Sequence, residues 1–199
     1  MATKLRKLSR EEVLQILRDT AVRAFVKADL RNADLRGMSL PYANLARAFL
    51  GKADLTGADL EGANLAGAQL DGVVLVEARL VGVNLAMAHL QEADLTKADL
   101  TAANLRGANL TEAILEGANL SATDLVCADL MRANLVGADL SGADLLGANL
   151  RDVDLEGANL KGANLEETNL EGANLKGAVM PDGFECLGYD KGGGCATTA

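Results

Sequence analysis

The stretch ADLEGANLAG, residues 58–67, contains the pattern that dominates this chain. Its two leucines are five residues apart, and every fifth residue from Leu30 to Leu175 is leucine, thirty in succession, with Met180 in the same phase. Two residues before each leucine the chain usually has alanine, and the residue between them is usually Asp or Asn. Glycine is the commonest residue two positions after the leucine.

A period of five fits neither of the regular elements. A helix needs apolar residues at spacings of three and four, and a half-buried strand needs spacings of two. On a single α-helix, successive leucines would be rotated by about 140° and would form no apolar face. The many glycines and Asn/Asp residues would each also be unfavourable in a helix interior by up to about 1 kcal/mol.

A solenoid is the remaining way to bury one leucine in every five residues. Each unit would contribute a short extended segment, whose Ala and Leu point inward, and then turn a corner. The polar residue between them points outward, and glycine and Asn/Asp accept the geometry of the corner at low cost. We expect the leucines to form the core, including Leu60, Leu80, Leu100, Leu105, Leu120, Leu140 and Leu160.

The tandem unit Ala-(Asp/Asn)-Leu-X-X, as in residues 58–62 and 63–67, resembles the pentapeptide repeat proteins over about three quarters of the chain. The resemblance implies an all-β solenoid, a right-handed quadrilateral β-helix with four pentapeptides per coil. Thirty units then make about seven and a half coils, stacked at about 4.8 Å into a rod about 36 Å long. The uninterrupted count predicts no long loop.

Three segments are expected. Residues 1–27 form a basic N-terminal segment, in which the Ser9-to-Glu12 capping box begins a short helix over about 10–19 that covers the first coil. A basic membrane anchor is the alternative for this helix. Residues 28–180 form the β-helix. In residues 181–199, after the turn at 181–183, the apolar side chains of Phe184, Leu187 and Tyr189 either plug the last coil or form a dimer contact, ahead of a flexible glycine-rich tail. The protein is thus expected to be a monomer or a homodimer joined at its C-terminal end.

Charge is distributed unevenly along the chain. The formal net charge is −9, but residues 1–36 carry nine basic and five acidic side chains and the remainder carries −13. Phosphate binding needs Lys and Arg, so we expect no direct nucleic-acid binding by the rod.

The three cysteines are Cys127, Cys186 and Cys195, an odd number without metal-ligand spacing, which favours reduced thiols in a cytoplasmic protein. A link between Cys186 and Cys195 is the alternative. We expect no membrane association, because no segment approaches the roughly 18 apolar residues of a membrane span.

When residues twenty positions apart are grouped together, one coil being four units of five, the outward residues form four faces. The face with the asparagine ladder is the smoothest, and it is interpreted either as inert surface or as a protein-docking face. Phe49, on another face, either contacts a partner or packs against the N-terminal helix. Residues that depart from the repeat give a rod its specificity, so the expected contacts with an unidentified protein partner are Phe49, Ala86, Val126 and Leu146.

An enzyme is the weakest class of function. His89 is the single histidine, and we expect no catalytic residue, cofactor or metal site, because spaced carboxylates on a flat face rarely supply six close oxygens. The leading interpretation is a rigid scaffold that binds proteins. Some pentapeptide repeat proteins resemble B-form DNA and bind DNA gyrase or topoisomerase IV, so a DNA mimic is the alternative, with Asp34, Asp54, Asp94 and Asp154 as its acidic residues.

Overall fold

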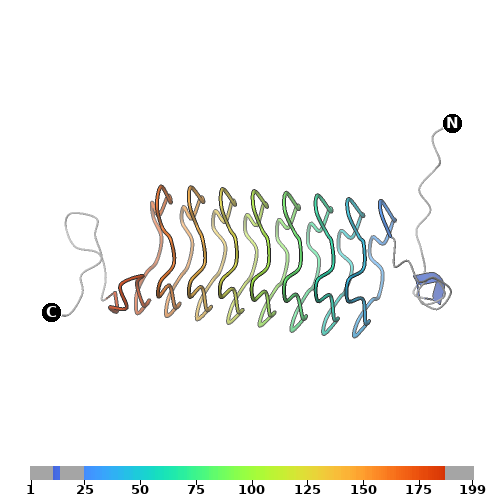
Figure 1. Cartoon of the computed structure of the whole chain (residues 1–199), viewed down its shortest axis with the longest axis horizontal. Coiled ribbons are helices and arrows are strands. Elements are labelled where there is room, and N and C mark those ends of the chain that lie inside the picture. The colour runs from blue at the N-terminus through green and yellow to red at the C-terminus, as the bar shows by residue number, and fades with distance from the viewer. Residues whose placement is uncertain (1–10, 14–24, 187–199) are drawn as a thin grey trace.

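The computed structural model describes residues 11–13 and 25–186. Residues 25–186 form one straight stack of similar coils, which runs from blue at the N-terminal end to red at the C-terminal end in Figure 1. The architecture is a right-handed quadrilateral β-helix, as the resemblance to pentapeptide repeat proteins implies. Residues 11–13 are helical; the rest of the helix expected over 10–19 lies outside the described residues.

The register between coils is constant. Each of the 27 parallel bridges joins a residue to the one twenty positions later, for example Asn64 to Asn84. The bridged residues are every fifth residue from Asp29 to Val179, which gives 31 positions and, at four per coil, nearly eight coils. Each bridge involves a single outward residue on each coil, so every side of the square is one short extended segment. The described residues form no longer strand. Four columns of outward side chains therefore run along the rod.

The turn between two sides explains the five-residue period. In one representative unit, the Ala58 N–H donates to the Leu55 carbonyl at 2.9 Å, and this closes a β-turn whose third residue, Gly57, has a φ of +63°. The N–H groups of Leu55 and Gly57 donate to carbonyls of the next coil, those of Val74 and Val76, at 2.7 and 2.9 Å. Turn and ladder together thus satisfy the backbone of each unit.

Sixteen residues other than glycine also have positive φ at this third turn position. Ala102, with a φ of +54°, is one of them, and a side chain in this region costs roughly 1–2 kcal/mol. We expect Ala102→Gly to raise the free energy of unfolding by about 1 kcal/mol, measured by urea denaturation, because relief of this strain exceeds the added chain entropy. The buried neighbour Ala103 is the control, since Ala103→Gly should destabilise the protein; equal effects at the two positions would contradict the argument.

The core is a single column of leucine and alanine along the axis of the rod. The leucines Leu60, Leu80, Leu100, Leu105, Leu120, Leu140 and Leu160 are at most 1 % exposed. Thr123 occupies an alanine position and is 1 % exposed, and its hydroxyl donates to the Leu100 carbonyl at 3.0 Å. The lumen accepts this polar group because it is hydrogen-bonded.

The N-terminal end of the ladder begins at Phe25, three residues before the expected boundary at 28. The Phe25 N–H donates to the Asn44 carbonyl at 2.6 Å, and the ring is 2 % exposed and belongs to the core. Val13, from the helical residues 11–13, belongs to the same buried cluster. The described part of the N-terminal segment thus contributes an apolar side chain to the core.

The C-terminal end folds back as a tight hairpin. Val179 and Glu185 form an antiparallel bridge around the turn at 181–183, and the Cys186 N–H donates to the Ala178 carbonyl at 2.7 Å. Phe184, one of the residues of the expected plug, is 54 % exposed, and the buried residue of the hairpin is Cys186. The other apolar residues of the expected plug, Leu187 and Tyr189, lie outside the described residues.

The expectation of reduced thiols is wrong for Cys186, which is disulfide-bonded. The predicted partner, Cys195, lies outside the described residues. Cys127 is a free, exposed cysteine near the middle of the rod.

Candidate functional site

The smoothest edge of the rod runs between the asparagine ladder and the Phe49 face. We call it the alanine corner, and two of the predicted contacts, Ala86 and Leu146, lie there as half-buried residues. Met87 follows Ala86 and is 67 % exposed, one of the most exposed large apolar side chains in the described structure. The corner consists of Ala46, Ala66, Ala86, Met87, Arg106, Val126, Cys127 and Leu146.

Val126 is the least exposed of the predicted contacts. It lies on the alanine corner but is only 5 % exposed, so a partner could reach little of it. The equivalent residues one coil away on either side are Arg106 and Leu146, and these longer side chains flank the valine. A smaller residue between two larger ones in a column about 4.8 Å apart is shielded.

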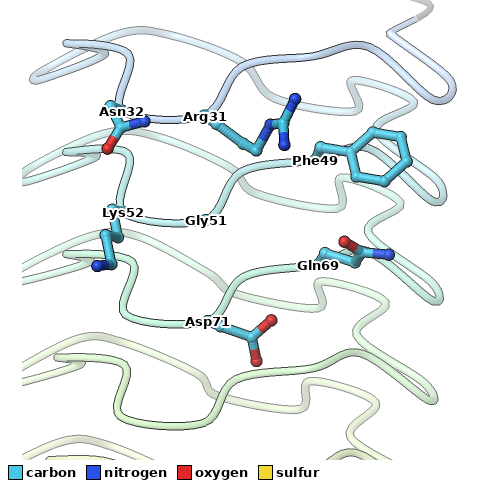
Figure 2. A pocket seen from close by; sticks show the side chains of 7 residues that line it. All are labelled: Arg31, Asn32, Phe49, Gly51, Lys52, Gln69 and Asp71. Carbon is cyan, nitrogen blue, oxygen red and sulfur yellow. The ribbon is translucent and has the colours of Figure 1, made fainter. Parts of the chain in front are cut away.

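Phe49 lies half-buried on the outside of the second coil. The Arg31 guanidinium lies 5.8 Å from the centre of its ring, a cation–π contact, and Figure 2 shows Arg31 extending toward the ring. The alternative of packing against the helix expected over about 10–19 concerns a segment of which only residues 11–13 are described. The described partner of Phe49 is therefore Arg31.

A shallow cavity of about 260 Å³ opens beside Phe49, and Figure 2 shows its lining. Asp29, which is 4 % exposed, holds Arg31 in two side-chain hydrogen bonds of 2.9 and 2.7 Å. These bonds raise the pKa of Arg31 and pair its charge with that of Asp29. The cavity is lined by Arg31, Asn32, Phe49, Gly51, Lys52, Gln69 and Asp71. The sequence indicated Phe49 here but not the surrounding basic and amide side chains, which a period of twenty brings together.

The predicted acidic residues lie in one outward column, but they do not form a continuous charged row. Val74 stands between Asp54 and Asp94, and Ile114, which is 40 % exposed, interrupts the row before Asp154.

Each of these carboxylates is also engaged in a hydrogen bond or an ion pair. Asp34 accepts two hydrogen bonds from Arg36, Asp54 and Asp94 each accept from the threonine two residues later, and Asp154 accepts from Asn174. Turn capping and ladder bonds thus account structurally for these acids.

Ion pairs between coils neutralise other acids. Arg79 contacts both Asp59 and Glu61, which raises the pKa of Arg79. At the C-terminal end, Lys176 donates to Glu156 at 2.8 Å; this hydrogen bond lowers the pKa of Glu156 and raises that of Lys176. These exposed pairs each contribute little stability. They remove charge from the surface that a DNA mimic would present.

Within residues 11–13 and 25–186, no group of three or more His, Cys, Asp or Glu side chains could hold a metal ion. His89 lies exposed in the Phe49 column, and Gln69 and Asn109 are its neighbours on the adjacent coils. The described part of the chain also contains no helix long and apolar enough to span a membrane.

The fold and its surface define a solenoid built from five-residue units. The family model described as "Pentapeptide repeats" matches in overlapping segments that together cover residues 25–180. The chain belongs to the pentapeptide repeat family.

Solved structures of several relatives resemble this chain. HetL, a pentapeptide repeat protein involved in heterocyst differentiation regulation from the cyanobacterium Nostoc sp. strain PCC 7120, is 32 % identical, with 89 % of this chain and 99 % of that chain covered and a TM-score of 0.41. Rfr23 from the cyanobacterium Cyanothece 51142 is 30 % identical over 86 % of this chain and 99 % of its own, with a TM-score of 0.34.

A more distant structure is QnrB1, a plasmid-mediated fluoroquinolone resistance protein. It is 18 % identical over 87 % of this chain and 88 % of its own, with a TM-score of 0.43, and this likeness concerns the fold alone. A search of curated proteins found no match.

Proposed function

We infer that this chain is a non-catalytic, rigid rod that binds another protein, in a cellular role still to be assigned. The observation that carries this proposal is the alanine corner, where small or apolar side chains occupy successive coils on a flat surface. Arg106 is the one charged side chain among the eight residues of the corner, and it is paired with Asp124 at 3.1 Å; the charged Arg47 and Glu167 lie beyond them, toward the two ends of the same edge. An apolar strip with a polar surface on either side is typical of a protein-binding site.

Rigidity supports the same proposal. Backbone hydrogen bonds join each coil to the next at nearly every unit, and the core is a continuous column of buried side chains. Such a rod presents residues at fixed positions, so binding would cost little conformational entropy. One side of the rod differs from the others in its departures from the repeat. The main ones are Met87 and Leu146 on the corner and Phe49 beside it.

The experiment is capture of binding partners from the source cells with the immobilised full chain and with Ala86→Glu/Leu146→Glu. The expected result is a partner retained by the wild-type chain and lost from the double variant, because two carboxylates interrupt the apolar strip. Val76→Glu/Val136→Glu, which places the same charges on another corner, is the matched control. Loss of the partner from both double variants, or from neither, would contradict binding at the alanine corner.

Charge density favours a second candidate, the DNA-mimicking inhibitor or protector of gyrase or topoisomerase IV. Residues 53–186 contain 22 acidic and seven basic side chains, a net charge of −15. These residues span about 6.7 coils, so at about 4.8 Å per coil the rod carries one net negative charge per roughly 2.1 Å, against about 1.7 Å along B-form DNA. The acids are distributed over all four faces, however, and many are paired.

A supercoiling assay with purified gyrase tests this second candidate. If the rod mimics DNA, inhibition is expected below about micromolar protein. The inhibition should weaken as salt is added, because the association is electrostatic. Asp54→Lys/Asp94→Lys should abolish it, whereas Asp144→Lys on the opposite face should not. Absence of inhibition at tens of micromolar would reject the DNA mimic and leave the protein-binding proposal intact.

Cytoplasmic location remains part of the proposal. The disulfide at Cys186 is the structural observation against it, because disulfides persist mainly in oxidising compartments. One relative, a pentapeptide repeat protein from Arabidopsis thaliana, comes from the thylakoid lumen; it is 37 % identical over 50 % of this chain and 66 % of its own, with a TM-score of 0.29.

A further inference from the structure

The two ends of the Phe49 face carry opposite charge. This face comprises the Phe49 column and the corner residues on either side of it. Near the N-terminal end, its exposed basic residues are Lys27, Arg31, Arg47 and Lys52. Near the C-terminal end, its exposed acidic residues are Asp152, Glu166, Glu167 and Glu171.

Several of these charges have no ion-pair partner among residues 11–13 and 25–186. Five basic side chains in residues 25–186 have no carboxylate partner, and three of the five, Lys27, Arg47 and Lys52, surround Phe49. Glu166 and Glu167 likewise have no basic partner in that part of the chain. Elsewhere the described rod pairs most of its bases, so one face combines unpaired positive charge at one end with unpaired negative charge at the other.

We propose that the Phe49 face binds the same face of a second copy of this chain in antiparallel orientation. A two-fold axis that crosses the face near Gly107 and Asn109 would place the basic end of each copy on the acidic end of the other. The contact is isologous and closes at two copies, because each face is used once. It differs from an end-to-end contact of the C-terminal hairpins.

The period of twenty fixes which residues would meet. Along the edge that contains the alanine corner, a two-fold axis at Gly107 places Arg47 of one copy opposite Glu167 of the other. The same axis places Met87 of one copy opposite Cys127 of the other. In the central column, reversal about Asn109 places His89 opposite Asp129, and Phe49 opposite Asn169. On the far corner, Asp71 meets Arg151, and Lys52 lies one coil away from Asp152. Opposite charges therefore coincide on both corners, although Arg106 and Glu112 near the axis each face their own equivalent in the second copy.

The column of Asp34, Asp54, Asp94 and Asp154 lacks this property, because reversal about its middle places Asp54 opposite Asp154. Like charges in direct apposition oppose association, so charge complementarity disfavours this face.

The face is large enough for a specific but weak dimer. Nearly eight coils at about 4.8 Å give a length of about 38 Å, and five residues at about 3.3 Å give a width of about 16 Å. The two copies together would bury about 1,200 Å², the lower end of the range for specific interfaces. Association is thus expected at micromolar rather than nanomolar concentrations and is expected to weaken with salt.

Sedimentation equilibrium of the full chain at low and high salt tests the proposal. We expect a monomer–dimer equilibrium whose dissociation constant rises at least tenfold between about 50 mM and 500 mM salt. Arg47→Glu and Glu167→Arg should each raise the dissociation constant about tenfold or more. The double variant Arg47→Glu/Glu167→Arg should restore most of the wild-type affinity, because each copy then presents the exchanged pair.

Lys97→Glu is the matched control, since Lys97 is also unpaired but lies on another corner. A chain that is monomeric at all concentrations would overturn the proposal. A dimer that responds equally to the Arg47 and Lys97 substitutions, or whose double variant is no better than either single variant, would overturn it too.

Covalent trapping reports the register directly. Met87→Cys places a thiol opposite Cys127 of the second copy, so mild oxidation should give a disulfide-linked dimer on a non-reducing gel. Met87→Cys/Cys127→Ser should not form it, and neither should Ala102→Cys, which places a thiol on another corner. Equal cross-linking of Met87→Cys and Ala102→Cys would indicate random collision and contradict the antiparallel register.

Discussion

Replacement of Leu105 by Asp is expected to destabilise the middle of the rod severely. The leucine is 0 % exposed, and its removal leaves a cavity worth about 2–5 kcal/mol before the cost of burying a carboxylate is added. We expect a loss of more than about 4 kcal/mol in the free energy of unfolding, measured by thermal melting followed by circular dichroism.

Asn104→Asp is the matched control, because it introduces the same side chain one residue earlier. Asn104 points outward, and its side-chain oxygen accepts the Arg106 N–H at 3.1 Å, a bond that aspartate can also form. Equivalent positions on the following coils already contain Asp124 and Asp144. A change within about 0.5 kcal/mol is expected, as for most surface substitutions. Similar losses for both variants would contradict the inward and outward assignment.

Excision of one whole coil is expected to leave a folded rod. Removal of residues 101–120 joins Leu100 to Ser121, so both the leucine phase and the twenty-residue register continue across the junction. The product should unfold cooperatively at a moderately lower temperature, since a solenoid is stabilised by each repeat and its neighbours. Small-angle scattering should show a rod shorter by about 4.8 Å.

Removal of 101–118 is the control for this excision. It deletes two residues fewer, but it places Leu100 and Leu120 only two positions apart and destroys the phase of every later unit relative to the earlier ones. We expect loss of cooperative unfolding and a large fall in melting temperature, because inward leucines can no longer stack in one column. A 101–118 variant as stable as the 101–120 variant would show that register contributes little.

The candidate contact residues show that residue type alone does not determine the exposure or the contacts of a side chain. Val126 and Leu146 occupy equivalent positions in neighbouring coils, and both are apolar, yet the valine is 5 % exposed while the leucine is half-buried. The difference depends on side-chain lengths one coil above and below. Phe49 is similar, because its contact with Arg31 joins residues eighteen positions apart. Such contacts follow only after the number of units per coil is known.

The sequence by itself determined the repeat, the identity of the core leucines and the turn positions. A strict period of five with a small residue, a polar residue and leucine is compatible with one buried column and no regular helix or strand. The same five-residue pattern recurs so many times that its structural interpretation is unambiguous.

Only the tertiary structure decided which outward residues are neighbours, where the rod begins and ends, and which charges are paired. Closure of a coil after twenty residues brings Arg31 beside Phe49 and leaves Lys27, Arg47 and Lys52 without carboxylate partners in the described chain. The C-terminal hairpin buries Cys186 and exposes Phe184, against the order expected from hydrophobicity. The physical reason is that burial and pairing depend on distances across coils, which a local pattern does not contain.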